Sequence, residues 1–198
     1  MTELLKNLND DFFLDKTPED IEEFVQNGLI DKEAIDKRWL GYPPATNAEI
    51  EKKEKELGHN LPDSYKKFFL VSNGFRYISP LLDNLRQLEK IDWALNNEEQ
   101  IDLFERFETI DRDEDYLVYG KCQEPYSFRG EYFKQSLKIS DWFDGMCVYL
   151  NPFITHSGEW EVLQFATWYP GTRRFRSFEE FLEETHKNNL ELMRNKSR

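Results

Sequence analysis

Three histidines are the residues whose type comes closest to a metal or acid–base site. His59, His156 and His186 lie far apart in the sequence, and none has a second His or Cys at the spacing of metal ligands. A structural zinc site needs four such ligands. We therefore interpret each of the three as an ordinary surface histidine.

The acidic run from Asp111 to Asp115 is similar to the start of a calcium-binding loop. An EF-hand loop has glycine at its sixth position and glutamate at its twelfth. Counted from Asp111, those positions hold Tyr116 and Cys122. The run therefore predicts a solvated acidic loop or a protein-binding surface, and no metal site.

The motifs of nucleophilic catalysis and of phosphate binding are missing from the sequence. It has no Gly-x-Ser-x-Gly elbow, no glycine-rich phosphate loop with lysine and no dinucleotide-binding Gly-x-Gly-x-x-Gly. With 39 acidic residues, accidental carboxylate pairs are common and single out no acid–base pair. The basic run from Arg173 to Arg176 allows a phosphate site, but a solvated strand end is the better interpretation. We expect no catalytic residue, no cofactor and no metal.

Composition favours a folded cytoplasmic protein. Aromatic residues make up 15% of the chain and predict a large core. Acidic residues interrupt the apolar ones in the first 15 positions, which argues against a secretory signal, and no apolar run is long enough to cross a bilayer. Cys122 and Cys147 form no Cys-x-x-Cys pattern and predict two buried thiols.

The net charge of −13 is concentrated in two segments. Residues 1–36 contain 11 acidic and 3 basic residues, and residues 81–120 contain 12 and 4. This distribution repels phosphate backbones and anionic membranes, so neither nucleic acid nor a membrane is an expected partner. A basic protein surface would be attracted. The alternative is that the charge only keeps the protein soluble.

Helix-start signals are frequent in the first half of the chain. Thr17 is followed by proline and two acids, and Thr46 begins a capping box with Glu49. A Pro-Pro pair after residue 42 marks a connector. The predicted helices begin near Thr17, Asp31, Thr46, Leu61, Asn96 and Ser177.

Short β-rich runs replace this pattern from residue 116 onward. They cover residues 116–119, 137–139, 146–150 and 160–166. The gaps between them are too short for helical crossovers, which predicts a mostly antiparallel sheet. We predict an α+β protein with the sheet flanked by helices, divided into an N-terminal helical extension over 1–38 and a main domain over 39–198.

An ordered series of short motifs runs from residue 39 to about residue 185. It comprises Trp39, Pro43-Pro44-Ala45-Thr46, Glu49-Ile50, Glu56-Leu57-Gly58, Leu61-Pro62, Tyr65-Lys66, Phe68, Asn73-Gly74, Ile139-Ser140-Asp141, Val148-Tyr149-Leu150-Asn151-Pro152, Gly158-Glu159-Trp160-Glu161, Trp168-Tyr169-Pro170-Gly171 and Ser177-Phe178 with Phe181-Leu182. In this order the motifs resemble the SUKH superfamily, which includes fungal cell-wall-assembly regulators and many bacterial immunity proteins.

The resemblance implies a twisted antiparallel sheet flanked by helices and a function by binding. Bacterial members are similar to neutralising partners of secreted polymorphic toxins, and fungal members act as scaffolds. The family offers no catalytic residue to carry over. The leading interpretation is an immunity protein that occludes a toxin, expected to be basic. The second is a regulatory scaffold without a toxin partner, and the third is a hydrolase without a recognisable signature.

Two acidic segments, 1–38 and about 92–135, depart from the compact pattern of that superfamily. We hypothesise that they shape the partner-binding face, the alternative being that both are solvated additions. The candidate partner-binding residues are Asp111, Asp113, Glu114, Asp115, Trp168 and Tyr169.

Overall fold

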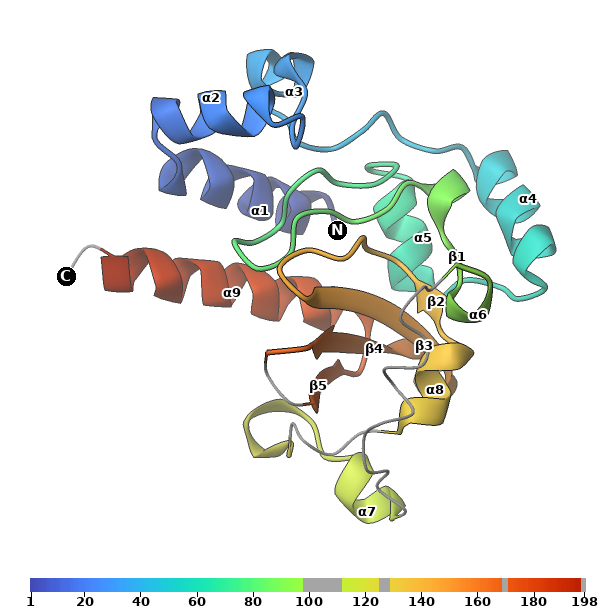
Figure 1. Ribbon diagram of the computed structural model, residues 1–198. Coiled ribbons are helices and arrows are strands. Elements are labelled where there is room, and N and C mark those ends of the chain that lie inside the picture. The colour runs from blue at the N-terminus through green and yellow to red at the C-terminus, as the bar shows by residue number, and fades with distance from the viewer. Residues whose placement is uncertain (98–111, 125–128, 169–170, 197–198) are drawn as a thin grey trace.

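The computed structural model describes residues 1–97, 112–124, 129–168 and 171–196 of the chain. The helices are α1 (Thr2–Asp15), α2 (Pro18–Gln26), α3 (Lys32–Lys37), α4 (Asn47–Leu57), α5 (Asp63–Phe69), α6 (Ala94–Asn97), α7 (Asp113–Tyr116), α8 (Gly130–Lys134) and α9 (Phe178–Lys196), with short 3₁₀ turns η1 (Leu88–Lys90) and η3 (Gly120–Cys122). The strands are β1 (Asp92–Trp93), β2 (Leu137–Lys138), β3 (Met146–His156), β4 (Glu159–Ala166) and β5 (Gly171–Phe175). The predicted α+β class is confirmed (Figure 1).

The strands form one antiparallel sheet in the order β1-β2-β3-β4-β5. The long hairpin of β3 and β4 is its centre, with Tyr149 opposite Leu163. The pairing shifts register between Asn151 and Thr155, near the turn of this hairpin. Because side chains alternate along a strand, this register assigns successive residues of β3 and β4 to opposite faces.

One face of the sheet packs against α5 and α9. Val148, Leu150 and Val162 are fully buried in the same cluster as Phe68 of α5 and Phe178 of α9. The rings of Phe68 and Phe178 lie 5.2 Å apart. We call this side of the sheet the α9 face, since α9 runs along it (Figure 1).

The opposite face carries a smaller core. Tyr149, Leu163 and Phe165 are buried there with Ala94 of α6 and Phe133 of α8. The ring of Phe133 lies 5.3 Å from that of Tyr149 and 5.6 Å from that of Phe165. We call this side the α8 face. Both faces of the central hairpin are thus covered, which explains why its strands read as nearly continuous apolar runs.

The predicted helical arm packs on the rest of the protein through α1. Leu5, Leu8 and Phe12 are buried in the cluster that also holds the α9 face. Helix α1 lies beside α9 (Figure 1), and Asp11 Oδ2 is 2.7 Å from His186 Nδ1 of α9. The arm therefore shares a core with the segment that follows it, while a domain boundary at residue 38 stays a prediction.

The predicted capping residues are confirmed where they begin helices. The Thr17 hydroxyl accepts from the Asp20 N–H, and Thr46 forms the expected reciprocal box with Glu49. Ser177 caps α9 by accepting from the N–H of Glu180 at 3.0 Å. Each cap satisfies an amide that has no partner inside its helix.

One predicted strand is wrong, and one predicted helix cannot be compared. Residues 116–119 form no strand, because Tyr116 ends α7 and its hydroxyl is bonded to a distant glutamate. The predicted helix after Asn96 lies mostly outside the described residues, which include only α6 at its start.

A polar junction ties the loop before η1 to the connection between β2 and β3. Asp141 accepts hydrogen bonds from Asn84 at 2.7 Å and from Arg86 at 2.8 Å. Burial acts to raise the pKa of Asp141, but these bonds outweigh it and lower the pKa. Oδ1 of nearby Asp83 is buried and accepts no hydrogen bond from the described residues. Burial together with the Asp141 charge raises the pKa of Asp83 to about 6.

We expect Asp83→Asn to stabilise the protein at neutral pH. Because folding raises the pKa of Asp83 from 3.8 to about 6, the wild-type protein loses stability as the pH rises through this range. The asparagine variant carries no charge there and avoids this loss. After allowing for solvent screening, the variant should gain about 1 kcal/mol above pH 7 and nothing near pH 4. Urea unfolding across this pH range measures the difference, with the exposed Asp36→Asn as control. A gain that does not depend on pH would contradict the explanation.

Candidate functional site

The described acidic candidates of the sequence form ion pairs with arginines of the same chain. Asp113, Glu114 and Asp115 form α7. Arg112 lies 2.7 Å from Asp115 and 3.1 Å from Glu114, and Arg129 lies 2.5 Å from Asp113. Asp111 lies outside the described residues. The described acids of this run are therefore neutralised in part by their own chain.

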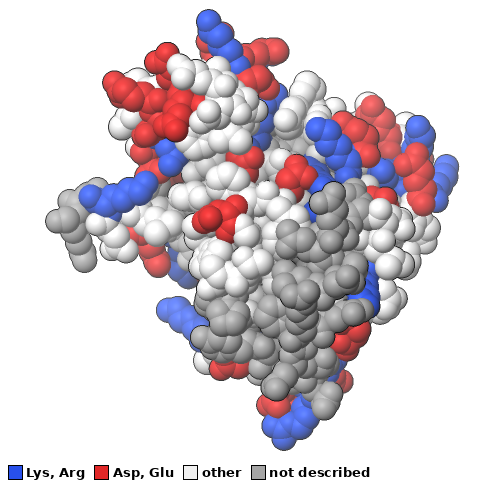
Figure 2. All heavy atoms as spheres, viewed as in Figure 1, with Lys and Arg blue, Asp and Glu red and all other residues white. Residues whose placement is uncertain are grey.

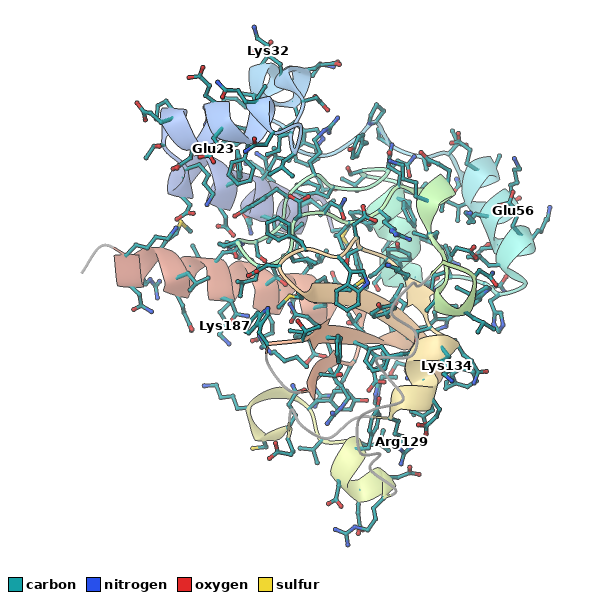
Figure 3. All side chains as sticks on the ribbon, in the orientation of Figure 1. Glu23, Lys32, Glu56, Arg129, Lys134 and Lys187 are labelled. Atoms are coloured by element: carbon teal, nitrogen blue, oxygen red, sulfur yellow. The ribbon has the colours of Figure 1, made fainter. Side chains whose placement is uncertain are left out.

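Arg129 anchors α7 to the start of α8 (Figure 3). Its side chain is buried, with the guanidinium carbon 4.8 Å from the ring centre of Tyr116 and a nitrogen 2.8 Å from the Tyr132 hydroxyl. A buried arginine held by a carboxylate and two aromatic rings is a structural element. The pairing of Asp113 with Arg129 therefore serves the packing of this segment.

Helix α2 presents the acidic surface that lacks such internal pairing. Glu19, Glu22 and Glu23 are exposed, and none of them forms an ion pair within the described chain. The helix contains no basic residue, and acidic side chains gather over the arm, whereas α4 carries both signs (Figure 2). The negative field of α2 is thus directed to solvent.

Trp168 is exposed, as a partner-binding residue must be, and contacts with neighbouring residues fix its position. The side chain is 52% exposed, and the indole N–H donates to the Asp144 carbonyl at 2.7 Å. Gly145 has a φ of +75°, and a Cβ there would collide with the Thr167 hydroxyl. The turn before β3 and the end of β4 therefore hold Trp168 in place. Tyr169 lies outside the described residues.

The acidic and aromatic candidates lie on different faces of the sheet. Tyr116, the last residue of α7, bonds to Glu161, whose side chain belongs to the α8 face. Trp168 lines a groove with Met146, Ala166 and other residues of the α9 face. The structure therefore does not join α7 and Trp168 into one contiguous surface.

A second groove, about 430 Å³ in volume, has aromatic walls. The rings of Trp93 and Trp160 lie 6.3 Å apart at an interplanar angle of 25°, and the His59 ring meets both edge-on. Phe153 lines the same groove and is 51% exposed. Most of the surface of Trp160 is buried, so only part of its ring faces the groove.

A buried carboxylate on the α8 face is the most elaborate polar site that sequence reasoning missed. Glu161 is fully buried. It accepts hydrogen bonds of 2.8 Å from the hydroxyls of Tyr116 and Tyr119 and from the Asn151 amide. Burial raises the pKa of Glu161, while these bonds and the charge of Arg174 act in the opposite direction. The two tyrosines fasten residues 116–119 to the sheet.

Arg174 corrects the interpretation of the basic run as a solvated strand end. The run does lie at the end of β5, but Arg174 is fully buried, with its guanidinium carbon 4.6 Å from the ring centre of Tyr116. The side chain of Gln123 accepts a hydrogen bond from the backbone N–H of Arg174 and donates one to its backbone carbonyl. Gln123 thus covers the open edge of β5 as a neighbouring strand would. Arg176 is exposed, as expected.

Two histidines and one cysteine also differ from expectation. His156 lies 2.8 Å from the Tyr119 hydroxyl, and burial lowers its pKa. His186 contacts Asp11, so it joins α9 to the arm. Cys147 is buried as predicted, but Cys122 is exposed because it lies in the η3 turn at the surface. These contacts are structural, since each joins segments that are distant in the sequence.

The described residues hold neither a metal-binding cluster nor a helix that could span a membrane. No group of three or more His, Cys, Asp or Glu side chains in these parts of the chain is arranged to hold a metal ion. Nor does any helix within them combine the length and apolar composition that crossing a membrane requires.

The architecture is that of an α+β domain with a central antiparallel hairpin, flanking helices and surface grooves that include those beside Trp168 and Trp160. Residues 44–184 match the family model described as SMI1 / KNR4 family (SUKH-1). The chain belongs to this family, which confirms the resemblance to the SUKH superfamily. No curated protein sequence matches the chain.

Proposed function

We propose that this protein is a non-catalytic, cytoplasmic binding protein that neutralises a cognate toxin. Membership of the SMI1 / KNR4 family (SUKH-1) supports a binding role, because immunity proteins and regulatory scaffolds are what the resemblance implies. The partner is a protein with a basic surface, in preference to nucleic acid or a membrane. A net charge of −13 would attract such a surface and repel the other two.

The unpaired acidic surface of α2 is the observation that supports a partner with a basic surface. Exposed carboxylates without internal cations retain their full field toward solvent and accelerate encounter with an oppositely charged protein. Glu19, Glu22 and Glu23 meet this description, whereas the acids of α7 already face arginines. Within the hypothesis that the two acidic segments shape the binding face, the arm therefore supplies the steering charge.

Co-purification with the product of the adjacent gene tests the proposal directly. The tagged protein should form a stoichiometric complex that weakens as the salt concentration rises. If no neighbouring gene product binds, the toxin proposal fails, and the regulatory scaffold of the cell-wall-assembly regulator type becomes the better explanation.

Neutralising α2 should slow association with that partner. The variant Glu19→Gln/Glu22→Gln/Glu23→Gln keeps the Thr17 cap and removes three negative charges. We expect its association rate constant at low salt to fall about 10-fold, with little change in dissociation. Stopped-flow fluorescence or surface plasmon resonance measures both rates.

A matched neutralisation of α7 serves as the comparison. The variant Asp113→Asn/Glu114→Gln/Asp115→Asn removes the same charge from acids that arginines already partner. We expect a smaller change in the association rate. A larger effect at α7 than at α2 would assign the binding face to the loop, and equal rates in all three proteins would exclude acidic steering.

A further inference from the structure

The groove beside Trp168 is built from five separate segments, one of which is the loop at residues 79–81. Met146 of β3, Ala166 of β4, Arg173 of β5 and Asn189 of α9 all line it, and its volume is about 340 Å³. This is enough space for one large side chain with adjoining backbone. The groove lies on the α9 face, where the sheet ends and α9 continues beyond it (Figure 1).

The walls of the groove are apolar and partly exposed. Met146 and Ala166 are buried at its base, while Trp168 and Leu192 at its sides are 52% and 41% exposed. Exposed Trp and Leu side chains that border a buried apolar base form the type of pocket that receives a hydrophobic anchor. An aliphatic or aromatic side chain is therefore the part of a ligand that this region would bury.

The charge of the groove is opposite to that of the protein. Arg173 lines it, and none of its described lining residues is an Asp or a Glu, in a chain with a net charge of −13. Arg173 has no carboxylate partner in the described parts of the chain, and its guanidinium carbon lies 5.4 Å from the ring centre of Phe175. A guanidinium in this position is suited to a carboxylate of the ligand.

A buried amide forms part of the α9 wall of the groove. Asn189 is 6% exposed, and its Nδ2 donates to Asp11 Oδ2 at 3.2 Å and to the Ile78 carbonyl at 2.8 Å. Its Oδ1 is buried and has no hydrogen-bond partner among the described residues. The two amide hydrogen bonds fix Asn189, and with it the α9 wall of the groove, to α1 and to the loop that holds Ile78.

We propose that this groove binds a segment of a partner protein in which a large hydrophobic side chain is followed by a carboxylate. The side chain enters between Trp168 and Leu192, and the carboxylate pairs with Arg173. The inference rests on the proposed function only in that a protein partner supplies the segment, and it gives that partner an anchor distinct from the charges of α2.

Binding of a small peptide probe tests the groove without the partner. N-acetyl-leucyl-phenylalanine with a free carboxylate should shift the NMR signals of the Trp168 indole and the Asn189 side-chain amide, with a Kd of about 1 mM. The C-terminal amide of the same peptide should bind about 10-fold more weakly, because it cannot pair with Arg173. Shifts at other sites only, or equal affinity for acid and amide, would overturn the proposal.

Two variants assign the effect to the groove. In Arg173→Gln the preference for the acid should disappear while apolar binding remains. The control Lys55→Gln removes the same charge from exposed helix α4, outside the residues that line the groove, and should preserve the preference. A preference that survives Arg173→Gln, or that Lys55→Gln also abolishes, would exclude the assigned role of Arg173.

The same variants separate this inference from the proposed function. If the product of the adjacent gene binds normally to Arg173→Gln and to Trp168→Ala, the protein neutralises its partner without the groove, and only the inference fails. If the peptide acid binds with the expected preference but no neighbouring gene product forms a complex, the groove stands and the toxin proposal fails.

Discussion

Replacing Phe12 with alanine is expected to lower the free energy of unfolding by about 4 kcal/mol. The ring is buried between α1 and the rest of the core, in edge contacts with Phe13, Phe24 and Tyr77 at centroid distances of 5.2, 5.7 and 5.0 Å. Truncation removes these contacts and leaves a cavity at the centre of the arm. For a protein of this size the loss corresponds to a decrease in Tm of about 10 °C, which differential scanning calorimetry measures.

The exposed neighbour Leu14 provides the control on the same helix. Leu14→Ala changes a side chain that is 76% exposed and should alter stability by no more than about 0.5 kcal/mol. Deleting residues 1–38 extends the test, because it would uncover the surface of α9 that includes His186 and Asn189. A deletion variant that unfolds cooperatively at the same temperature as the full chain would show that the arm is a separable addition.

The arm illustrates which features the sequence predicts well. Helix starts depend on residues three positions apart, so Thr17 with Asp20 and Thr46 with Glu49 were visible locally, and both caps are confirmed. Short β-rich runs bounded by turn residues likewise located β3 and β4. What the local pattern did not contain is the packing of α1 on α9, which joins residues such as Asp11 and His186 from opposite ends of the chain.

The errors share this long-range origin. The apolar run at 116–119 resembles a strand, yet its two tyrosines are held by Glu161, more than 40 positions later. Arg174 reads as a surface residue from its neighbours, and only the segment that covers β5 buries it. Polar residues in buried networks violate the local hydrophobic pattern, so sequence reasoning assigns them to solvent.

The candidate site follows the same rule. Trp168 was a candidate because a binding protein needs exposed aromatic anchors, and the side chain is exposed. Its groove partners Arg173 and Asn189 were not identified, since β4, β5 and α9 bring them together only in the folded chain. The acids of α7 were chosen for their density, but the sequence did not reveal that Arg129 and Arg112 partner them.

Glu161→Ala is expected to reduce the free energy of unfolding by about 4 kcal/mol. The substitution leaves the hydroxyls of Tyr116 and Tyr119 and the Asn151 amide without their acceptor in a buried site. Each unsatisfied buried donor costs about 1 to 3 kcal/mol, part of which is recovered where water enters. Residues 116–119 should also detach from the sheet, which amide hydrogen exchange at these positions would detect as lost protection.

Glu161→Gln separates the loss of hydrogen bonds from the loss of charge. Glutamine keeps the shape and one acceptor oxygen, so the expected deficit is about 2 kcal/mol, half that of alanine. Because burial raises the folded-state pKa of Glu161, the wild-type protein loses stability as the pH rises through that pKa, whereas the glutamine variant has no group titrating there. The deficit of Glu161→Gln should therefore be largest in acid and shrink toward neutral pH, as urea unfolding at several pH values would show. Equal stability of the alanine and glutamine variants would mean that the three donors find other partners, and that Glu161 does not fasten residues 116–119 to the sheet.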